Sequence, residues 1–283
     1  MDRVRDVISL PYARSLSLTG KGITIAYLDT GLSLHKDFLT PSNRLLHFHD
    51  FIHQKSIPYA DHEHGTHVIG IAASSLLGIA PHSSIIALKV LDAKGNGRYS
   101  HMSAAFQWLL SHKEEYQIRI VNISIGMPAS SKKSYGEQLL HWVDRLWDAG
   151  LVVCIASGND GPGPSTVTLP GTSHKIITVG SSDDFASPYS GRGPTSQCIV
   201  KPDLLAPGTG IRSCYKTDQY IKRSGTSMAT PIVSGAIALY LEKHPTSTNK
   251  MVKYKLRSSC DDLGLSPNHQ GWGRINIKKL LSD

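Results

Sequence analysis

The chain has 283 residues, of which 40% are hydrophobic and 18% are charged. This balance is typical of a folded globular protein and excludes a largely disordered one. Lysine and arginine outnumber aspartate and glutamate by 30 to 22. The basic residues are scattered and no aromatic residues are interleaved with them, so the charge predicts no nucleic-acid partner. No apolar run in the sequence is long enough to span a bilayer.

Residues 1–6 are charged and lead into no long apolar stretch, so the sequence shows no signal peptide. This favours a cytoplasmic location, with a mature domain cut from a secreted precursor as the alternative. The cysteines are far apart and form no Cys-x-x-Cys pair of the kind that binds structural zinc. They are Cys154, Cys198, Cys214 and Cys260. The sequence leaves their disulfide state open.

Apolar runs rich in β-branched residues alternate with longer segments of helical spacing. The predicted strands are 23–28, 85–90, 118–125, 151–156 and 176–179. The predicted helices are 64–73, 102–112, 135–149 and 228–242. Such alternation predicts an α/β fold of three layers, in which helices flank a mostly parallel central sheet. No repeat or low-complexity linker interrupts the chain, so we expect residues 1–283 to form a single domain.

Polar side chains follow two of the predicted strands. Asp29 closes the first strand, and Asn159 follows the strand that ends at Ala156. Ligands of open parallel sheets meet the loops beyond the carboxyl ends of the strands. This rule selects Asp29 and Asn159 as candidate site residues.

A serine can act as a nucleophile only when a base takes its proton and an acceptor orients that base. Ser227 follows a Gly-Thr pair and begins the long apolar helix, where unpaired N–H groups favour a developing anion. His64 opens another helix, next to Gly65, which permits a close approach of the backbone. Taken alone, a serine in a Gly-Thr-Ser turn is more often a helix cap than a nucleophile.

Segments along almost the whole chain resemble the motifs of the subtilisin family, in its Asp, His, Ser order. They are Asp29-Thr30-Gly31, His64-Gly65-Thr66-His67, 122–126, 156–161, 190–195, 201–208, Gly225-Thr226-Ser227-Met228-Ala229-Thr230-Pro231 and 271–276. The resemblance implies a three-layer α/β/α subtilisin-like fold. It also implies a serine endopeptidase that hydrolyses peptide bonds through a covalent acyl-enzyme.

The resemblance implies a role for each matching residue. Ser227 is then the nucleophile, His64 the general base and acid, and Asp29 the carboxylate that orients the imidazole. The Asn159 amide and the backbone N–H of Ser227 form the oxyanion hole, which Thr226 supports.

Substrate binding is expected to rest on the peptide backbone. Ser124, Ile125 and Gly126 would pair with a bound peptide as an added strand, and a segment with Gly97 and Tyr99 would flank it on the other side. Tyr99 is also expected to line an outer apolar pocket.

Two further residues bear on the preferred substrate side chain. We expect Asp160 at the rim of the main pocket, where it would favour basic side chains. We expect Thr168 near the base of that pocket.

The expected partner is a protein or peptide substrate, and a propeptide or inhibitor is a second partner that the resemblance implies. The main alternative function is a catalytically silent subtilisin-fold protein that binds peptides or a partner. An acid protease of the sedolisin type is a third interpretation. The complete set of catalytic residues argues against the silent protein, and His64, which stands where sedolisins carry glutamate, argues against the acid protease.

No metal or cofactor is expected to be required. Residues 61–67 are rich in metal ligands, but Thr66 stands where a zinc-binding His-Glu-x-x-His motif needs its second histidine. Residues 72–81 form a short stretch where many secreted relatives insert a calcium-binding loop. Asp37 resembles a carboxylate of that site, yet it lacks oxygen partners, so we expect weak calcium binding at most.

Overall fold

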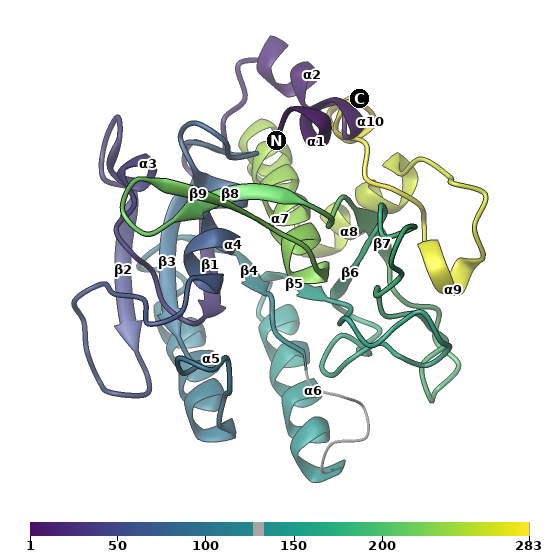
Figure 1. Cartoon of the computed structure of the whole chain (residues 1–283), viewed down its shortest axis with the longest axis horizontal. Coiled ribbons are helices and arrows are strands. Elements are labelled where there is room, and N and C mark those ends of the chain that lie inside the picture. Colours follow the sequence, from purple (N-terminus) through teal and green to yellow (C-terminus); the bar gives the residue numbers. More distant parts are fainter. Residues whose placement is uncertain (127–132, 283) are drawn as a thin grey trace.

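The computed structural model describes residues 1–126 and 133–282 (Figure 1). Its central element is a parallel sheet in the strand order β2–β3–β1–β4–β5–β6–β7. The strands are β1 Thr24–Asp29, β2 Leu45–Asp50, β3 Ser84–Lys89, β4 Ile118–Ile123, β5 Val152–Ala156, β6 Ile177–Ser181 and β7 Leu204–Ala206. A separate antiparallel hairpin joins β8 Ile211–Tyr215 to β9 Gln219–Arg223.

The helices flank this sheet. They are α1 Asp2–Val7, α2 Leu10–Ser15, α3 Lys36–Leu39, α4 His64–Ala73, α5 Tyr99–His112, α6 Lys133–Asp148, α7 Thr226–Lys243, α8 Asn249–Ser259, α9 Pro267–Gln270 and α10 Ile277–Leu281. Helix α4 packs against α7 on one side of the sheet, and α5 packs against α6 on the other (Figure 1). The predicted three-layer α/β fold is confirmed.

Five strands lie within one or two residues of their predicted positions, because central parallel strands are buried on both faces and read as continuous apolar runs. Every residue of β1 and β5 is buried. Two strands of the sheet, and both strands of the hairpin, were not predicted. In β2 half-buried residues and two histidines interrupt the apolar pattern at the edge of the sheet, and β7 has only three residues.

Helix α7 passes through the interior, and Met228 to Leu241 are all buried. Its predicted all-round apolar character is confirmed. Gly235 permits its close approach to the segment after α4, since a Cβ at this position would lie 2.7 Å from the Cβ of Ile79. This packing brings the amino-terminal end of α7 to the carboxyl ends of the central strands.

The two ends of the chain pack together at the top of Figure 1, where α2 contacts α10. The Ile277 N–H donates to the Ile8 carbonyl at 2.8 Å, and Leu10 is buried there. Among the described residues, no helix has the length and apolar character needed to cross a membrane.

Candidate active site

The carboxyl ends of the strands bring Asp29 and His64 together. Asp29 ends β1 and is only 2% exposed, and its Oδ1 lies 2.8 Å from Nδ1 of His64, the first residue of α4. The same oxygen accepts the N–H of Thr30 at 2.7 Å. Gly65 is needed for this approach, because a Cβ there would lie 2.3 Å from the carbonyl oxygen of Gly31.

The electrostatics of this pair favour a charged imidazole. Burial lowers the pKa of His64, but the negative charge of Asp29 and its hydrogen bond raise it more, so the net pKa lies above the ordinary value of 6.5. The second carboxylate oxygen of Asp29 is buried and has no hydrogen-bond partner among the described residues. The stabilising interaction of Asp29 with an imidazolium therefore passes through the single bond to Nδ1.

A buried lysine that the sequence analysis missed holds the loop before His64. Lys89 pairs with Asp29 across β1 and β3, and its side chain is fully buried. Its ammonium donates to the Thr30 carbonyl at 2.8 Å and to the Asp61 carboxylate at 2.7 Å. An ammonium can stay buried only when it is paired and hydrogen-bonded in this way.

His67 connects α4 to the hairpin. It is fully buried, as expected for a residue that packs in the helix, but its Nε2 also lies 3.1 Å from the carbonyl oxygens of Ile211 in β8 and Ile221 in β9. Burial lowers its pKa to about 4, so the ring is neutral at physiological pH. Through His67, the helix that begins at His64 is fastened to the hairpin that leads into Ser227.

Ser227 and Ser124 are joined by two hydrogen bonds. The Ser227 hydroxyl donates to the Ser124 carbonyl at 3.0 Å, and the Ser124 hydroxyl donates to the Ser227 carbonyl at 3.1 Å. Pro231 explains why this carbonyl is available. Proline has no N–H, so the helix provides no donor to the residue four positions earlier.

The link continues into the core through Asn122, within the family-like segment 122–126, and Ser234, which the sequence analysis missed. The Asn122 amide of β4 donates to the Ser124 hydroxyl at 3.0 Å and accepts from the Ser234 hydroxyl of α7 at 2.9 Å. The side chains of Asn122, Ser124 and Ser234 are all buried. They form a polar chain between α7 and β4, and each member is satisfied by the next.

Asn159 faces the turn that precedes α7. Its side-chain oxygen accepts the Thr226 N–H at 2.9 Å and the Thr226 hydroxyl at 3.1 Å. The Thr226 hydroxyl also accepts the N–H of Gly158 at 3.2 Å. Because these bonds occupy the oxygen of the Asn159 amide, its N–H₂ group is left as the donor beside Ser227.

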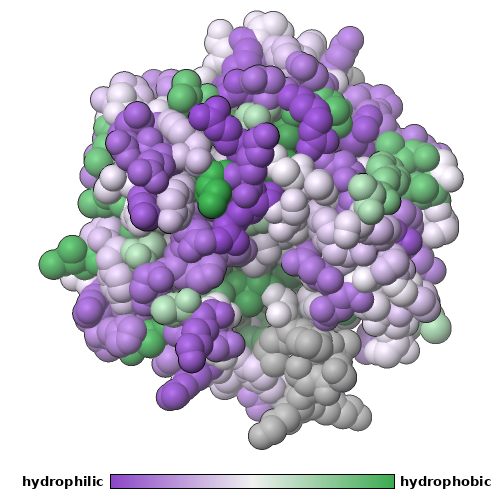
Figure 2. All heavy atoms as spheres, in the orientation of Figure 1, coloured by the Kyte–Doolittle hydropathy of each residue, from purple (hydrophilic) through white to green (hydrophobic). Residues whose placement is uncertain are grey.

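Residues 124–126 follow the end of β4, where Ser124 is buried, Ile125 is half-buried and Gly126 is exposed. Beside them lies a cavity of about 230 Å³ that is lined by Gly97, Ile125, Gly126 and mostly apolar neighbours. These neighbours include Leu91, Met102, Leu139 and Leu169. In the view of Figure 2 the surface is mostly polar, and apolar residues gather in a hollow near its centre.

Tyr99 is the first residue of α5. It is not one of the described residues that line this cavity. Its hydroxyl accepts the Trp142 indole N–H at 3.0 Å, and its ring packs edge-on against Tyr135, which does line the cavity. The side chain of Tyr99 therefore supports the wall from behind.

Thr168 occupies the space between two glycines. A Cβ at Gly126 would lie 2.1 Å from its hydroxyl oxygen, and a Cβ at Gly158 would lie 2.3 Å from its methyl group. Thr168 is buried, and its hydroxyl donates to the Ser157 carbonyl at 3.4 Å. Asp160, in contrast, is exposed to solvent.

A model of the Subtilase family of peptidases matches residues 20–273. The chain belongs to the subtilase family. It is 37% identical to Serine protease AprX of Bacillus subtilis, over 94% of this chain and 67% of that protein. It is 35% identical to Subtilisin of Bacillus pumilus, over 96% of this chain and 95% of the relative. The same identity relates it to Subtilisin E of Bacillus subtilis, over 96% of this chain and 68% of the relative.

Membership of the subtilase family makes the chain a subtilisin-like serine endopeptidase, a hydrolase of peptide bonds. A catalytic triad and an oxyanion hole are general features of subtilases, and protease substrates are peptides. The predicted subtilisin-like fold and enzyme class are confirmed, and the comparisons give no support to the catalytically silent alternative.

The buried polar chain gives a first prediction. Ser124→Ala removes the donor to the Ser227 carbonyl and the acceptor of the Asn122 amide, so we expect the free energy of unfolding to fall by about 1–3 kcal/mol. Urea unfolding in a Ser227→Ala background, which prevents self-digestion, measures this loss. The matched control is Ser111→Ala, because Ser111 is exposed and its hydroxyl bonds within its own helix. Equal stabilities of the two variants would contradict the polar chain.

Proposed function

We propose that Ser227 is the nucleophile of this subtilase, with His64 as its base and Asp29 as the carboxylate that orients His64. The observation that carries the assignment is the 2.8 Å hydrogen bond between Asp29 Oδ1 and His64 Nδ1. Because Nδ1 donates to the carboxylate, the lone pair of the neutral ring lies on Nε2, the atom that must accept the serine proton.

The reaction begins when the Ser227 hydroxyl exchanges its hydrogen bond to Ser124 for one to His64. As the serine oxygen attacks the scissile carbonyl carbon, its proton passes to Nε2 of His64. Asp29 stays ionised and stabilises the imidazolium. The imidazolium then protonates the departing amine, and the acyl group remains on Ser227 until water, activated by the same histidine, releases it.

The tetrahedral oxyanion forms beside the amino-terminal end of α7. We assign the Asn159 N–H₂ group and the Ser227 N–H as its donors. Thr226 supports this assignment because it engages the Asn159 oxygen and so fixes the amide orientation before the substrate arrives. Such preorganised donors are worth about 3–4 kcal/mol of transition-state stabilisation each, which is the range known for the oxyanion amide of subtilisin itself.

Substrate peptides are proposed to bind as an added strand between residues 124–126 and the segment at Gly97. Backbone pairing of this kind gives affinity, and pockets for alternate side chains give specificity. The 230 Å³ cavity beside Ile125 suits an apolar side chain of the substrate. A propeptide or protein inhibitor would have to present the same extended backbone to this edge.

We propose that the side chain before the scissile bond must be small. Thr168 supports this because its side chain fills the space between the backbones at Gly126 and Gly158. Asp160 favours basic side chains, but it is exposed, so its charge is worth only about 0.2–1 kcal/mol. One excess methylene in a tight pocket costs about 1–3 kcal/mol. The volume of the substrate side chain is therefore expected to affect the cleavage rate more than the charge of Asp160 does.

We also propose that calcium binds at most weakly and is not needed for the fold. Asp37 accepts hydrogen bonds from the Ser74 and Tyr220 hydroxyls, so side-chain donors satisfy its carboxylate. Calcium prefers six to eight oxygen ligands, and the neighbours of this carboxylate include a histidine and a cysteine.

The assignment of the nucleophile is tested with a fluorophosphonate probe. We expect one equivalent of label on Ser227 in the wild-type chain and none in Ser227→Ala, with hydrolysis lowered by at least about a thousandfold. Asn159→Ala keeps the nucleophile and is expected to react with the probe while kcat falls by about 10²–10³-fold. Labelling of the Ser227→Ala chain at another serine would overturn the assignment.

The pH dependence follows from the raised pKa of His64. Only the neutral imidazole accepts a proton, so kcat/KM is low at acid pH and increases as pH rises through a pKa above 6.5, to an alkaline plateau. Asp29→Asn removes the charge that raises this pKa. We expect its acid limb to move to lower pH and its plateau to fall by about 10⁴-fold. An unshifted acid limb would contradict the role of Asp29.

Thr168→Gly tests the small pocket. We expect kcat/KM for peptides with leucine or phenylalanine before the scissile bond to rise by roughly 10–200-fold relative to alanine peptides. Thr168→Ser keeps the hydroxyl bonded to Ser157 and is expected to give an intermediate profile. In Asp160→Asn the preference for lysine is expected to fall by less than about fivefold. A cleavage profile unchanged by Thr168→Gly would refute the proposal.

Calcium binding is tested by thermal unfolding of the metal-free Ser227→Ala chain. We expect calcium at about 1 mM to leave the midpoint nearly unchanged, because a ligand stabilises the native state only in proportion to its occupancy. Magnesium at the same concentration controls for ionic strength. A rise of about 5 °C or more with calcium alone would contradict the proposal.

A further inference from the structure

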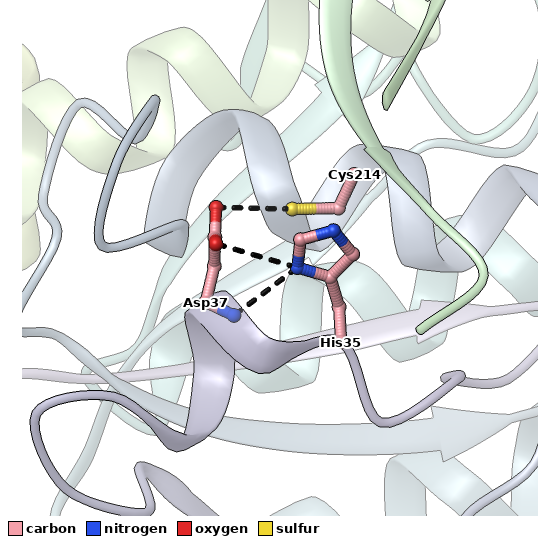
Figure 3. Close-up of side chains that lie close together, drawn as sticks. All are labelled: His35, Asp37 and Cys214. Atoms are coloured by element: carbon pink, nitrogen blue, oxygen red, sulfur yellow. Dashed lines mark hydrogen bonds and ion pairs between the residues drawn. The ribbon is translucent and has the colours of Figure 1, made fainter. Parts of the chain in front are cut away.

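Beneath the hairpin, three side chains of different chemistry meet in the interior (Figure 3). They are His35, in the loop before α3, Asp37 of α3 and Cys214 of β8. Their exposed fractions are 0%, 4% and 0%. The nitrogen, oxygen and sulfur atoms that they offer lie within 4.8 Å of one another. None of the three residues has a role in the proposed hydrolysis.

Two of the separations match those in a metal coordination sphere. Oδ1 of Asp37 lies 3.5 Å from Nδ1 of His35, and Oδ2 lies 3.8 Å from Sγ of Cys214. A tetrahedral zinc ion with bonds of about 2.0–2.3 Å holds its ligand atoms about 3.3–3.8 Å apart. The Asp37 carboxylate therefore lies at a coordinating distance from each of the other two donors.

The hydrogen bond of His35 to Gln219 sets the tautomer that a metal at Nδ1 requires. Its Nε2 lies 3.0 Å from the Gln219 carbonyl oxygen, so Nε2 carries the proton. The lone pair is then on Nδ1, which accepts the Asp37 N–H at 3.1 Å and faces the carboxylate. A backbone carbonyl that fixes the tautomer in this way is the usual outer partner of a metal-binding histidine.

We propose that His35, Asp37 and Cys214 bind one divalent transition-metal ion of the zinc type. The mixed nitrogen, oxygen and sulfur ligands select such an ion over calcium or magnesium, which take oxygen ligands. On binding, the thiol releases its proton to solvent, and thiolate and carboxylate together neutralise the two positive charges. This balance of charge is what permits an ion in a buried site.

A hydroxyl group completes the site. Tyr220 donates to both oxygens of the Asp37 carboxylate, at 2.9 and 3.1 Å, and Ser74 donates to Oδ2. We assign the fourth position of the ion to one of these hydroxyl oxygens. The ion competes with the Asp37 N–H for Nδ1 of His35, which limits its affinity.

The bound ion would fasten α3 to the hairpin, on the same side as His67 fastens α4. Its expected effect is on stability, because it binds the native state and none of its ligands contacts the substrate edge. The proposal does not rest on the assignment of catalytic residues, and its test uses an inactive chain.

Cobalt(II) is the probe, because cobalt bound to a thiolate absorbs in the near ultraviolet. In the full-length Ser227→Ala chain, freed of metal, we expect a thiolate-to-cobalt band that saturates at one equivalent and is displaced by zinc. The added substitution Cys214→Ser is expected to abolish the band. Cys198→Ser, at an exposed cysteine, is the matched control and is expected to keep it.

Two further measurements keep the test independent of the folding of one variant. X-ray absorption of the zinc-loaded Ser227→Ala chain should show one sulfur neighbour at about 2.3 Å and nitrogen or oxygen neighbours at about 2.0 Å. Asp37→Asn is expected to weaken cobalt binding at least tenfold. Absence of the band, its survival in Cys214→Ser, or a zinc environment without sulfur would each overturn the proposal.

Discussion

The attachment of α7 to β4 is the interaction on which the site depends. Helix α7 is buried along most of its length, but apolar packing alone does not fix its rotation or its depth, because hydrophobic contacts are not directional. The Ser234–Asn122–Ser124 chain and the reciprocal bonds between Ser124 and Ser227 supply that direction. Burial of these polar groups is tolerated only while every bond is made, so an α7 displaced by even one bond length would leave several of them unsatisfied.

The imidazole side of the site is held by a different kind of contact. Helix α4 begins at His64, and the hairpin lies over it, joined by His67 at one end and by the Asp37 cluster at the other. Lys89 holds the preceding loop. The residues that position His64 thus come from segments before and after it in the sequence. The position of its imidazole depends on their packing as much as on the motif that contains His64.

Much of the fold, and the positions of the candidate site residues, could be predicted from the sequence. The central strands and α7 are buried on all sides, so their apolar runs are continuous and easily recognised. Asp29, His64, Asn159 and Ser227 stand in short local motifs at strand and helix ends. The hairpin was missed because exposed and half-buried residues interrupt its strands. The partners of Asp37 were missed because 177 positions separate it from Cys214, and only the tertiary fold brings them together.

The bonds that assemble the site span long stretches of chain: 35 positions from Asp29 to His64, 67 from Asn159 to Thr226 and 103 from Ser124 to Ser227. Contacts of such sequence separation form late, because the entropy of closing large loops must be overcome first. Ser227, the proposed nucleophile, lies in the last quarter of the sequence, and Asp29, the proposed orienting carboxylate, lies near its beginning. A chain still being synthesised, or only partly folded, therefore has no assembled protease site. Proteolysis by this chain therefore begins only after the tertiary fold has formed.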